Sequence, residues 1–590
     1  MFLPFVISLL QSFETRIDHF NTMDKRNFTL YYSVLDQSFF SESILIYIDE
    51  FFPIDQTEKN IPVVIKQIAH QTNSTIITIQ HRYFHQSKIF NNLSIESLQY
   101  NTINQRLADI AALSRHLHKT QNITRSIIVG SGFGGSLAAW FRLKYPQYID
   151  GAWVSSPSQL VSKFFFDDAN KNIQEKMDKI SPKCAQITGN IIEYIENKLI
   201  ENKQNYESII KKNEIENFTK NANLNKFSSD FIKDIDYIEF NNQRNDKITK
   251  NEKIDNFDIR KIFGLNENMK KESVMFIISE MLVYLSLSNS PRRSSKNINI
   301  EKYCSEISTW SEKVDDNTLF QFAKLFNQTF NDFNINQTEL DPYASDSDNP
   351  PTKFLQNQRI MLHLRCSQLG GFRIADNDTK IRSKMVNSKY FRNMCDDLFK
   401  IKIKNDESIF NRLFGQLSYG GSSMWLSYSS QDITKQLLSN VKSDMSREFY
   451  VNEIESESYS DELYIGQIFE HLNGHSSNNF LNLNGHSMNV SNSYPEDLIR
   501  LKNDSVDVIS RWLNLSFDDH CGKWGTRILN HCKCNESYSG SDCNQYVVSK
   551  NQFRTMSAIT MLVPTLLVIL VAIFAWCFIL EDSDSTHFVI

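Results

Sequence analysis

Short apolar runs alternate with amphipathic stretches through the first third of the chain. The runs Ser43–Ile48 (SILIYI), Ser74–Ile79 (STIITI) and Arg125–Gly130 (RSIIVG) are rich in β-branched residues, as strands buried on both faces are. Thr102–His118 carries apolar residues three and four positions apart, and Gly134–Lys144 follows a glycine turn, so both segments are predicted to be helices. Strands and helices that alternate through short links predict an α/β fold with a parallel sheet.

The pattern changes at about residue 165. Residues 166–345 are rich in Asn, Lys, Ile and Glu with helical spacing, which predicts a helical insertion. The strand pattern returns from Ile401 and continues at Met424–Tyr428 and Phe480–Leu483, and Tyr494–Leu513 predicts a last amphipathic helix. The predicted sheet is therefore interrupted by the insertion and resumes after it.

Both ends of the chain carry apolar segments. Phe2–Leu10 is typical of a signal-peptide core with a cut near Ser12, and the alternative is a buried first strand. Met556–Leu580 has no charged residue and is long enough to cross a bilayer of about 30 Å as a helix. Lys550 and Arg554 precede this span, which by the positive-inside rule would place the tail outside. A cleaved signal sends the bulk of the chain across first, so we expect a type I orientation with a short cytoplasmic tail.

Composition and cysteines agree with a secretory route. The net charge of -6 gives no reason to expect nucleic acid as a partner, and no phosphate-binding glycine loop is present. Of 9 cysteines, Cys577 lies in the predicted span and eight remain to pair. Cys532–Cys543 reads C-x-C-x8-C, like the second half of an EGF repeat, and Cys521 supplies a fourth thiol. We expect this module to be a disulfide-stabilised stalk or a binding module, located at the cell surface or in a lysosome- or vacuole-type membrane.

A local repeat contains two histidines. Leu472–Ser476 and Leu483–Ser487 both read LNGHS, but no carboxylate or cysteine cluster stands at ligand spacing beside them. We therefore expect no metal and no cofactor.

The segment Gly130–Gly134 (GSGFG) joins a predicted strand to a predicted helix, where α/β-hydrolases place the nucleophile elbow, G-x-S-x-G. The residues two before and two after the tip must be very small, because strand and helix crowd there. A tip at residue 132 has Gly130 and Gly134 as these neighbours, whereas a tip at Ser131 has Val129 and Phe133. The predicted tip is therefore Gly132, which has no nucleophile.

With these residues the chain resembles peptidase family S28, the serine carboxypeptidases that include lysosomal Pro-Xaa carboxypeptidase and dipeptidyl peptidase II. Phe13–Asn21 (FETRIDHFN) has the family's DHFN, Gln80–Ser87 (QHRYFHQS) is similar to EHRYYGES, and Gln105–Ala112 (QRLADIAA) is similar to QALADLA. Gly130–Pro157 follows GGSYGGMLAAWFRLKYPH and the residues after it almost position by position. The resemblance covers about residues 13–515, implies an α/β-hydrolase fold with a helical lid, and places the family's catalytic Ser at Gly132.

The resemblance also implies the other two triad positions. The family's His falls on His486, with His475 as the fallback, and the family's terminal Trp falls on Trp512. The family's Asp, in SNGxxDPW, falls on Asp432 in Ser427–Thr434 (SYSSQDIT), without the Pro and Trp that follow it in the family. The alternative is that His486 and Asp432 are ordinary polar loop residues.

Two further positions depart from the family. Its glycine-rich turn GGEGP is replaced by residues 48–53 (IDEFFP), with Phe51 and Phe52 in place of glycines. Its substrate-binding Glu in CTEFG is replaced by Gln368, which keeps hydrogen bonding but loses the charge.

The family match implies a disulfide between Cys366 and Cys395, which leaves Cys184 and Cys304 to pair within or across the insertion. In the EGF-like module we expect Cys534 to pair with Cys543.

We therefore expect a membrane-anchored S28-like pseudopeptidase with a binding or surface role; the alternative is an active exopeptidase that cleaves prolyl bonds near peptide termini through Ser131 or Ser136. The partners considered are a peptide or protein ligand, the membrane and a second copy of the chain. The predicted segments are a signal peptide at 1–12, the hydrolase domain at 13–165 and 396–516, the helical insertion at 166–395, the EGF-like module at 521–543, the membrane helix at 556–580 and the tail at 581–590.

Overall fold

The structure is a computed structural model of the whole chain. It describes residues 8–35, 42–48, 61–121, 123–210, 258–287, 298–333, 335–403, 407–415, 421–429, 438, 442–454, 496–513 and four short strand segments between 525 and 546. The chain divides into two compact units, Met1–Val506 and Asp507–Ile590.

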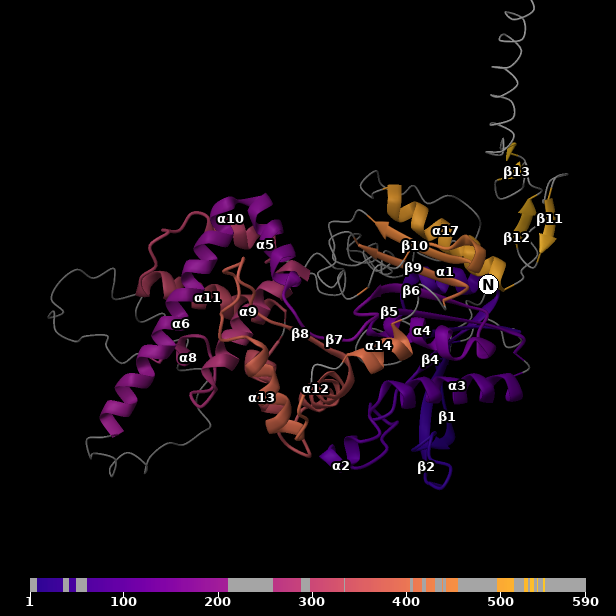
Figure 1. Cartoon of the computed structure of the whole chain (residues 1–590), viewed down its shortest axis with the longest axis horizontal. Helices are drawn as coiled ribbons and strands as arrows, with labels where there is room; N and C mark the ends of the chain where they lie inside the picture. The colour runs from indigo at the N-terminus through magenta and orange to yellow at the C-terminus, as the bar shows by residue number, and fades with distance from the viewer. Residues whose placement is uncertain are drawn as a thin grey trace, which may run out of the picture. The chain divides into compact units, whose positions relative to one another are not determined.

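A sheet of eight strands forms the centre of the first unit, in the order β1-β2-β4-β3-β5-β6-β9-β10 (Figure 1). The pairs β1–β2 and β2–β4 are antiparallel, and the pairs from β4 across to β10 are parallel. The strands are β1 (Ser8–Arg16), β2 (Asn27–Leu35), β3 (Ser43–Ile48), β4 (Ser74–Ile79), β5 (Arg125–Gly132), β6 (Gly151–Pro157), β9 (Met424–Ser429) and β10 (Phe449–Ile454). The predicted α/β-hydrolase fold is confirmed.

The middle strands are largely buried, and helices pack against them. All six residues of β3 are buried. Helix α1 (Val63–Gln71) packs on β4, and α4 (Phe133–Lys144) packs on β5 and β6. Helix α3 (Ile103–Thr120) packs on α4 and starts at Thr102, whose side chain accepts a hydrogen bond from the Gln105 backbone N–H.

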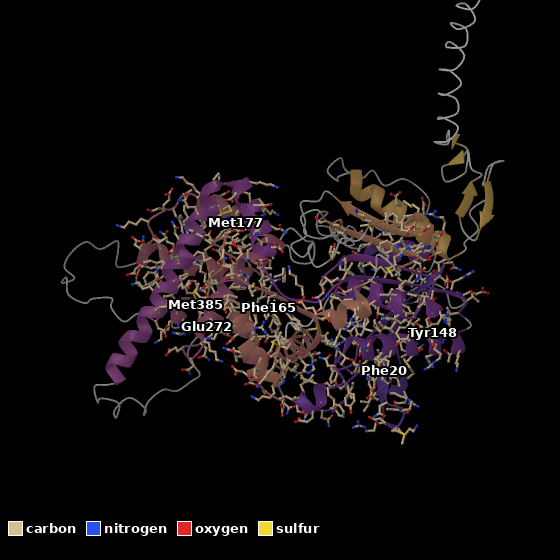
Figure 2. The ribbon with its side chains drawn as sticks, in the orientation of Figure 1. Phe20, Tyr148, Phe165, Met177, Glu272 and Met385 are labelled. Carbon is tan, nitrogen blue, oxygen red and sulfur yellow. A yellow bond between two sulfur atoms is a disulfide. The ribbon has the colours of Figure 1, made fainter. Side chains whose placement is uncertain are left out.

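The helices of the insertion pack around a second hydrophobic core, which also takes in Tyr83, Phe84 and Leu98 (Figure 2). Met177 is fully buried in it and Met385 packs against it. Two disulfides, Cys184–Cys304 and Cys366–Cys395, join its helices, and both were expected. Its helices are α5 (Asp168–Ile180), α6 (Pro182–Ile210), α8 (Ile259–Ile262), α9 (Lys271–Leu287), α10 (Ile300–Ile307), α11 (Asp316–Asp332), α12 (Lys353–Leu364) and α13 (Ser388–Phe399).

Two details of this region differ from the expectation. Short parallel strands β7 (Lys163–Phe166) and β8 (Gly370–Arg373) pair at the neck of the insertion, and runs of four residues leave no readable alternation in the sequence. The strand pattern expected from Ile401 is wrong for the described residues there, because residues 401–403 form no strand and the next described element is helix α14 (Ser408–Phe414). The alternation of Ile401 and Ile403 arises because both side chains pack on the insertion core.

The ends of the chain are described only in part. Residues of the predicted signal peptide from Ser8 onward belong to β1, where Ser8 lies opposite Leu35, so a cut near Ser12 would remove half of that strand. Helix α17 (Glu496–Trp512) lies where a last helix was expected. The second unit contains the strand pairs β11 (Gly525–Ile528) with β12 (His531–Cys534) and β13 (Tyr538–Ser539) with β14 (Gln545–Tyr546).

The described residues contain no helix that is both long and apolar enough to cross a membrane. The expected span at 556–580 lies outside them, as do Cys521 and Cys543.

Candidate active site

Strand β5 turns into helix α4 at Gly132. The backbone of Gly132 has φ 54° and ψ -123°, a conformation that residues with a side chain rarely adopt. The register between β5 and β6 shifts between Ser131 and Gly132, because the chain leaves the sheet at this point. Gly132 therefore has the strained backbone expected of an elbow tip.

The crowding around the tip follows the steric rule. A Cβ placed on Gly130 would lie 2.2 Å from the carbonyl oxygen and 2.4 Å from the carbonyl carbon of Gly134. A Cβ on Gly135 would lie 2.8 Å from the Ser155 carbonyl oxygen. Strand and helix backbones touch at these glycines, so the tip is held two residues after Gly130.

The serines near the elbow occupy structural positions. Ser131 lies within β5, pairs in register with Ser155 and is 3% exposed. Ser136 is fully buried; its Oγ donates to the Gly132 carbonyl oxygen at 3.4 Å and accepts from the Gln159 backbone N–H at 3.2 Å. The Gly132 carbonyl also accepts from the Ser158 backbone N–H at 3.0 Å. These contacts fix the elbow to the loop after β6.

Gln368 lies in a π-helical turn, η5 (Arg365–Leu369), that follows α12. Its Oε1 accepts a hydrogen bond of 2.8 Å from the backbone N–H of Ile103, the first residue of α3. Its neighbour Leu369 accepts from Gln159 Nε2 at 3.1 Å. The carboxamide of Gln368 thus satisfies a helix N-terminus, a role in which it needs only an acceptor.

Other site residues expected from the sequence lie outside the described residues. They are Asp432, His475, His486 and the turn at 49–53. Trp512 is the last residue of α17. In the part of the chain that is described, no three His, Cys, Asp or Glu residues gather in a way that could hold a metal ion.

A buried ion cluster joins three of the sequence motifs, and sequence reasoning missed it. Asp109 of α3 accepts from Arg82 Nε at 2.6 Å and Arg82 Nη2 at 2.8 Å, and its Oδ1 lies 2.8 Å from His19 Nε2. Arg82 and Asp109 are fully buried. Burial opposes ionisation of Asp109, but Arg82 and His19 outweigh it and hold the pKa of Asp109 below its usual value. His19 of DHFN, Arg82 of QHRY and Asp109 of LAD therefore connect the segments that follow β1 and β4 to α3.

The family comparison agrees with this geometry. A family model described as Serine carboxypeptidase S28 matches residues 15–291 and 266–433. The chain belongs to the serine carboxypeptidase S28 family.

Relatives within and near the S28 family share local stretches of sequence. Lysosomal Pro-X carboxypeptidase of Mus musculus is 32% identical over 184 residues, which cover 30% of this chain and 37% of the relative. The Homo sapiens protein of the same name is 32% identical over 152 residues, covering 24% and 30%. Prolyl carboxy peptidase like protein 5 of Caenorhabditis elegans is 35% identical over 111 residues, covering 18% and 21%. The alignments thus cover well under two thirds of each relative.

Two solved structures resemble parts of the chain. Est1E of Butyrivibrio proteoclasticus, with bound ferulic acid, has a TM-score of 0.19 at 13% identity, covering 23% of this chain and 51% of that one. The Pyrococcus furiosus esterase Pf2001 has a TM-score of 0.21 at 11% identity, covering 30% and 56%. Likeness at this level says nothing of substrate or activity.

Proposed function

We propose that this chain is a catalytically impaired S28 protein that binds a peptide or protein ligand at the former active site. It is held at a secretory-pathway or surface membrane in type I orientation by the predicted span at 556–580. The observation that carries the proposal is the backbone of Gly132, which has the geometry of the elbow tip and no side chain.

Serine hydrolysis needs a hydroxyl at the tip. The nucleophile must stand within hydrogen-bond reach of its base, roughly 2.6–3.2 Å, and must be open to substrate. Ser131 and Ser136 are 3% and 0% exposed, and Ser136 already bonds to Gly132 and Gln159. Neither residue is placed to replace the missing serine.

Departures elsewhere support loss of catalysis rather than a shifted nucleophile. Phe51 and Phe52 replace glycines of the family's turn, and Gln368 replaces its substrate-binding Glu. Gln368 can still connect the insertion to α3 through Ile103. A binding protein keeps such connections, whereas it has no need of the carboxylate charge.

The relatives suggest the class of ligand. Proteins named lysosomal Pro-X carboxypeptidase share up to 33% identity with parts of this chain, so a peptide with proline near its terminus is the first candidate. The same name favours the secretory route, with the lysosome or cell surface as its end.

Hydrolysis by the detergent-solubilised full chain tests the proposal. We expect no turnover of prolyl peptides above background. A triad enzyme without its nucleophile retains a hydrolysis rate only about 10³–10⁴-fold above that of the uncatalysed reaction in water. The same preparation should give no covalent labelling by a fluorophosphonate probe. Robust turnover or labelling that is lost in Ser131→Ala or Ser136→Ala would overturn the proposal.

A further inference from the structure

Three sequons of the form Asn-x-Ser/Thr lie in the described part of the helical insertion. They start at Asn327 in α11, at Asn336 just before the short helix η3 (Gln337–Leu340), and at Asn377 after β8. In none of them is the middle residue proline, so each meets the sequence requirement for an N-linked glycan in a secreted chain. The structure separates them, because a glycan needs a carboxamide that solvent can reach.

The first sequon starts at a packed residue of the insertion. Asn327 is half-buried; its Nδ2 donates to the Ile262 carbonyl oxygen at 2.9 Å, and its Oδ1 accepts from Gln337 Nε2 at 3.2 Å. A Cβ placed on Gly264 would lie 3.3 Å from the same Oδ1. Thr329, which completes the sequon, is fully buried. Both polar atoms of the Asn327 carboxamide are therefore used inside the fold, and a sugar ring on Nδ2 would displace these partners.

The second sequon, nine residues further on, is open. Asn336 is exposed, and its Oδ1 accepts from the Thr338 backbone N–H at 3.2 Å and from the Thr338 hydroxyl at 2.8 Å. In the described part of the chain, its side chain forms hydrogen bonds through Oδ1 alone. An N-linked glycan attaches to Nδ2, so the cap that Oδ1 provides for η3 is kept when the glycan is present.

The third sequon lies in a turn that its neighbours hold in place. Asp376 accepts from the Thr379 backbone N–H and, at 2.7 Å, from the Thr379 hydroxyl, and Asp378 pairs with Lys171 Nζ at 3.0 Å. Asn377 between them is exposed, and its side chain forms no hydrogen bond with the residues that the structure describes. The turn is therefore rigid, while the carboxamide of Asn377 is open to a glycan.

We propose that Asn336 and Asn377 carry N-linked glycans and that Asn327 does not. The inference rests on the secretory route of the proposed function. In the transfer, Nδ2 of the asparagine loses a proton and bonds to C1 of the first sugar of a lipid-pyrophosphate-linked oligosaccharide. The bond from C1 to the pyrophosphate oxygen breaks, and the lipid pyrophosphate leaves with the electron pair. A chain that receives the sugar at Asn327 cannot pack the carboxamide against Ile262 and Gln337.

The two glycans also limit where a ligand can bind. The glycan at Asn336 covers the surface between α11 and η3, and the glycan at Asn377 covers the turn that Lys171 joins to α5. N-linked glycans are bulky and hydrated, so they keep a protein partner from packing on the surface around them. A ligand of the proposed function therefore binds away from these two parts of the insertion.

Peptide mass spectrometry of the full chain tests the assignment. The chain is expressed in a eukaryotic secretory host, solubilised in detergent and treated with peptide N-glycosidase in heavy-oxygen water, which converts each glycosylated asparagine to a labelled aspartate. We expect the label at positions 336 and 377 and unmodified asparagine at position 327. On gels, Asn336→Asp and Asn377→Asp should each remove the mobility shift of one glycan.

Asn327→Asp is the matched control. It destroys a sequon as Asn336→Asp does, but it should leave the mobility unchanged, because no glycan is lost. It also replaces the donor to the Ile262 carbonyl oxygen by an acceptor, so its Tm should fall. After enzymatic deglycosylation, Asn336→Asp should have the Tm of wild type, because its carboxylate still accepts from Thr338. The peptide map of wild type decides the question even if Asn327→Asp does not fold.

Failure of this inference is distinguishable from failure of the proposed function. The assignment alone is overturned if Asn336 or Asn377 is unmodified while other sequons of the chain, such as the one at Asn27, carry glycans. A glycan on Asn327 in folded protein also overturns the assignment and leaves the secretory route intact. A chain without a glycan at any sequon overturns both the assignment and the secretory route.

Discussion

Replacing Gly130 should destabilise the protein more than replacing Gly132, although Gly132 has the strained backbone. An added Cβ at Gly130 meets three backbone atoms, at 2.2, 2.4 and 2.8 Å, and none of them can rotate away. Ordinary carbon contacts need about 3.5 Å, so β5 and α4 would have to separate by about 1 Å. Over-packing of this kind costs about 1–3 kcal/mol, and with backbone atoms on every side Gly130→Ala should fall at or above the upper end.

Gly132→Ala brings mainly a conformational penalty. A side chain at φ 54° and ψ -123° costs about 1–3 kcal/mol. Urea unfolding followed by tryptophan fluorescence measures both free energies, and Trp140 on α4, which is fully buried, is a suitable reporter. Ala138→Gly, in the interior of the same helix, is the control and should cost about 1 kcal/mol. An equal or smaller loss in Gly130→Ala than in Gly132→Ala would refute the assigned tip.

Three other outcomes follow from contacts described above. Replacing Cys366 or Cys395 by Ser should cost about 3–4 kcal/mol, since the bridge closes a loop with a sequence separation of 29, and urea unfolding with and without reductant checks this. The folded-state pKa of Asp109 is depressed, so its stabilisation is present above the ordinary Asp pKa of about 3.9 and is lost as pH falls through the lower folded value. Asp109→Asn should therefore lower the free energy of unfolding by about 3–5 kcal/mol at neutral pH, because it leaves the buried charge of Arg82 without its counter-ion. The stability of this variant should also fall less steeply with decreasing pH than that of wild type. Gln368→Ala should cost about 1–3 kcal/mol by leaving an N–H of α3 without its acceptor, whereas Gln368→Glu should be tolerated; equal Tm values for the two variants would contradict this role.

The sheet was predictable because a strand that is buried on both faces is a short run of apolar and β-branched residues. β3 and β4 are short runs rich in β-branched residues, and the predicted bounds of both match the structure. The glycines at the turn from β5 to α4 were predictable for a different reason: only glycine fits at Gly130, where the strand and helix backbones touch.

The ion cluster could not be predicted, because its members lie far apart in the sequence. His19, Arg82 and Asp109 come from three segments, and nothing in each motif says that its charge points inward. Arg106 looks like an ordinary polar residue of an amphipathic helix, yet it is fully buried. The short strands β7 and β8 were not predicted, because four residues are too few to show an alternation of apolar and polar positions.

The most direct test of the account is to place a serine at position 132. Gly132→Ser places a hydroxyl at the elbow tip, and if His486 and Asp432 still serve as base and orienter, that hydroxyl becomes more reactive than any native serine. The measurement is fluorophosphonate labelling of Gly132→Ser, of the same variant with His486→Ala, and of wild type, after Tm has shown that each is folded. The account predicts labelling of Gly132→Ser alone. A folded Gly132→Ser that stays unlabelled, or a wild type that labels equally, would contradict it.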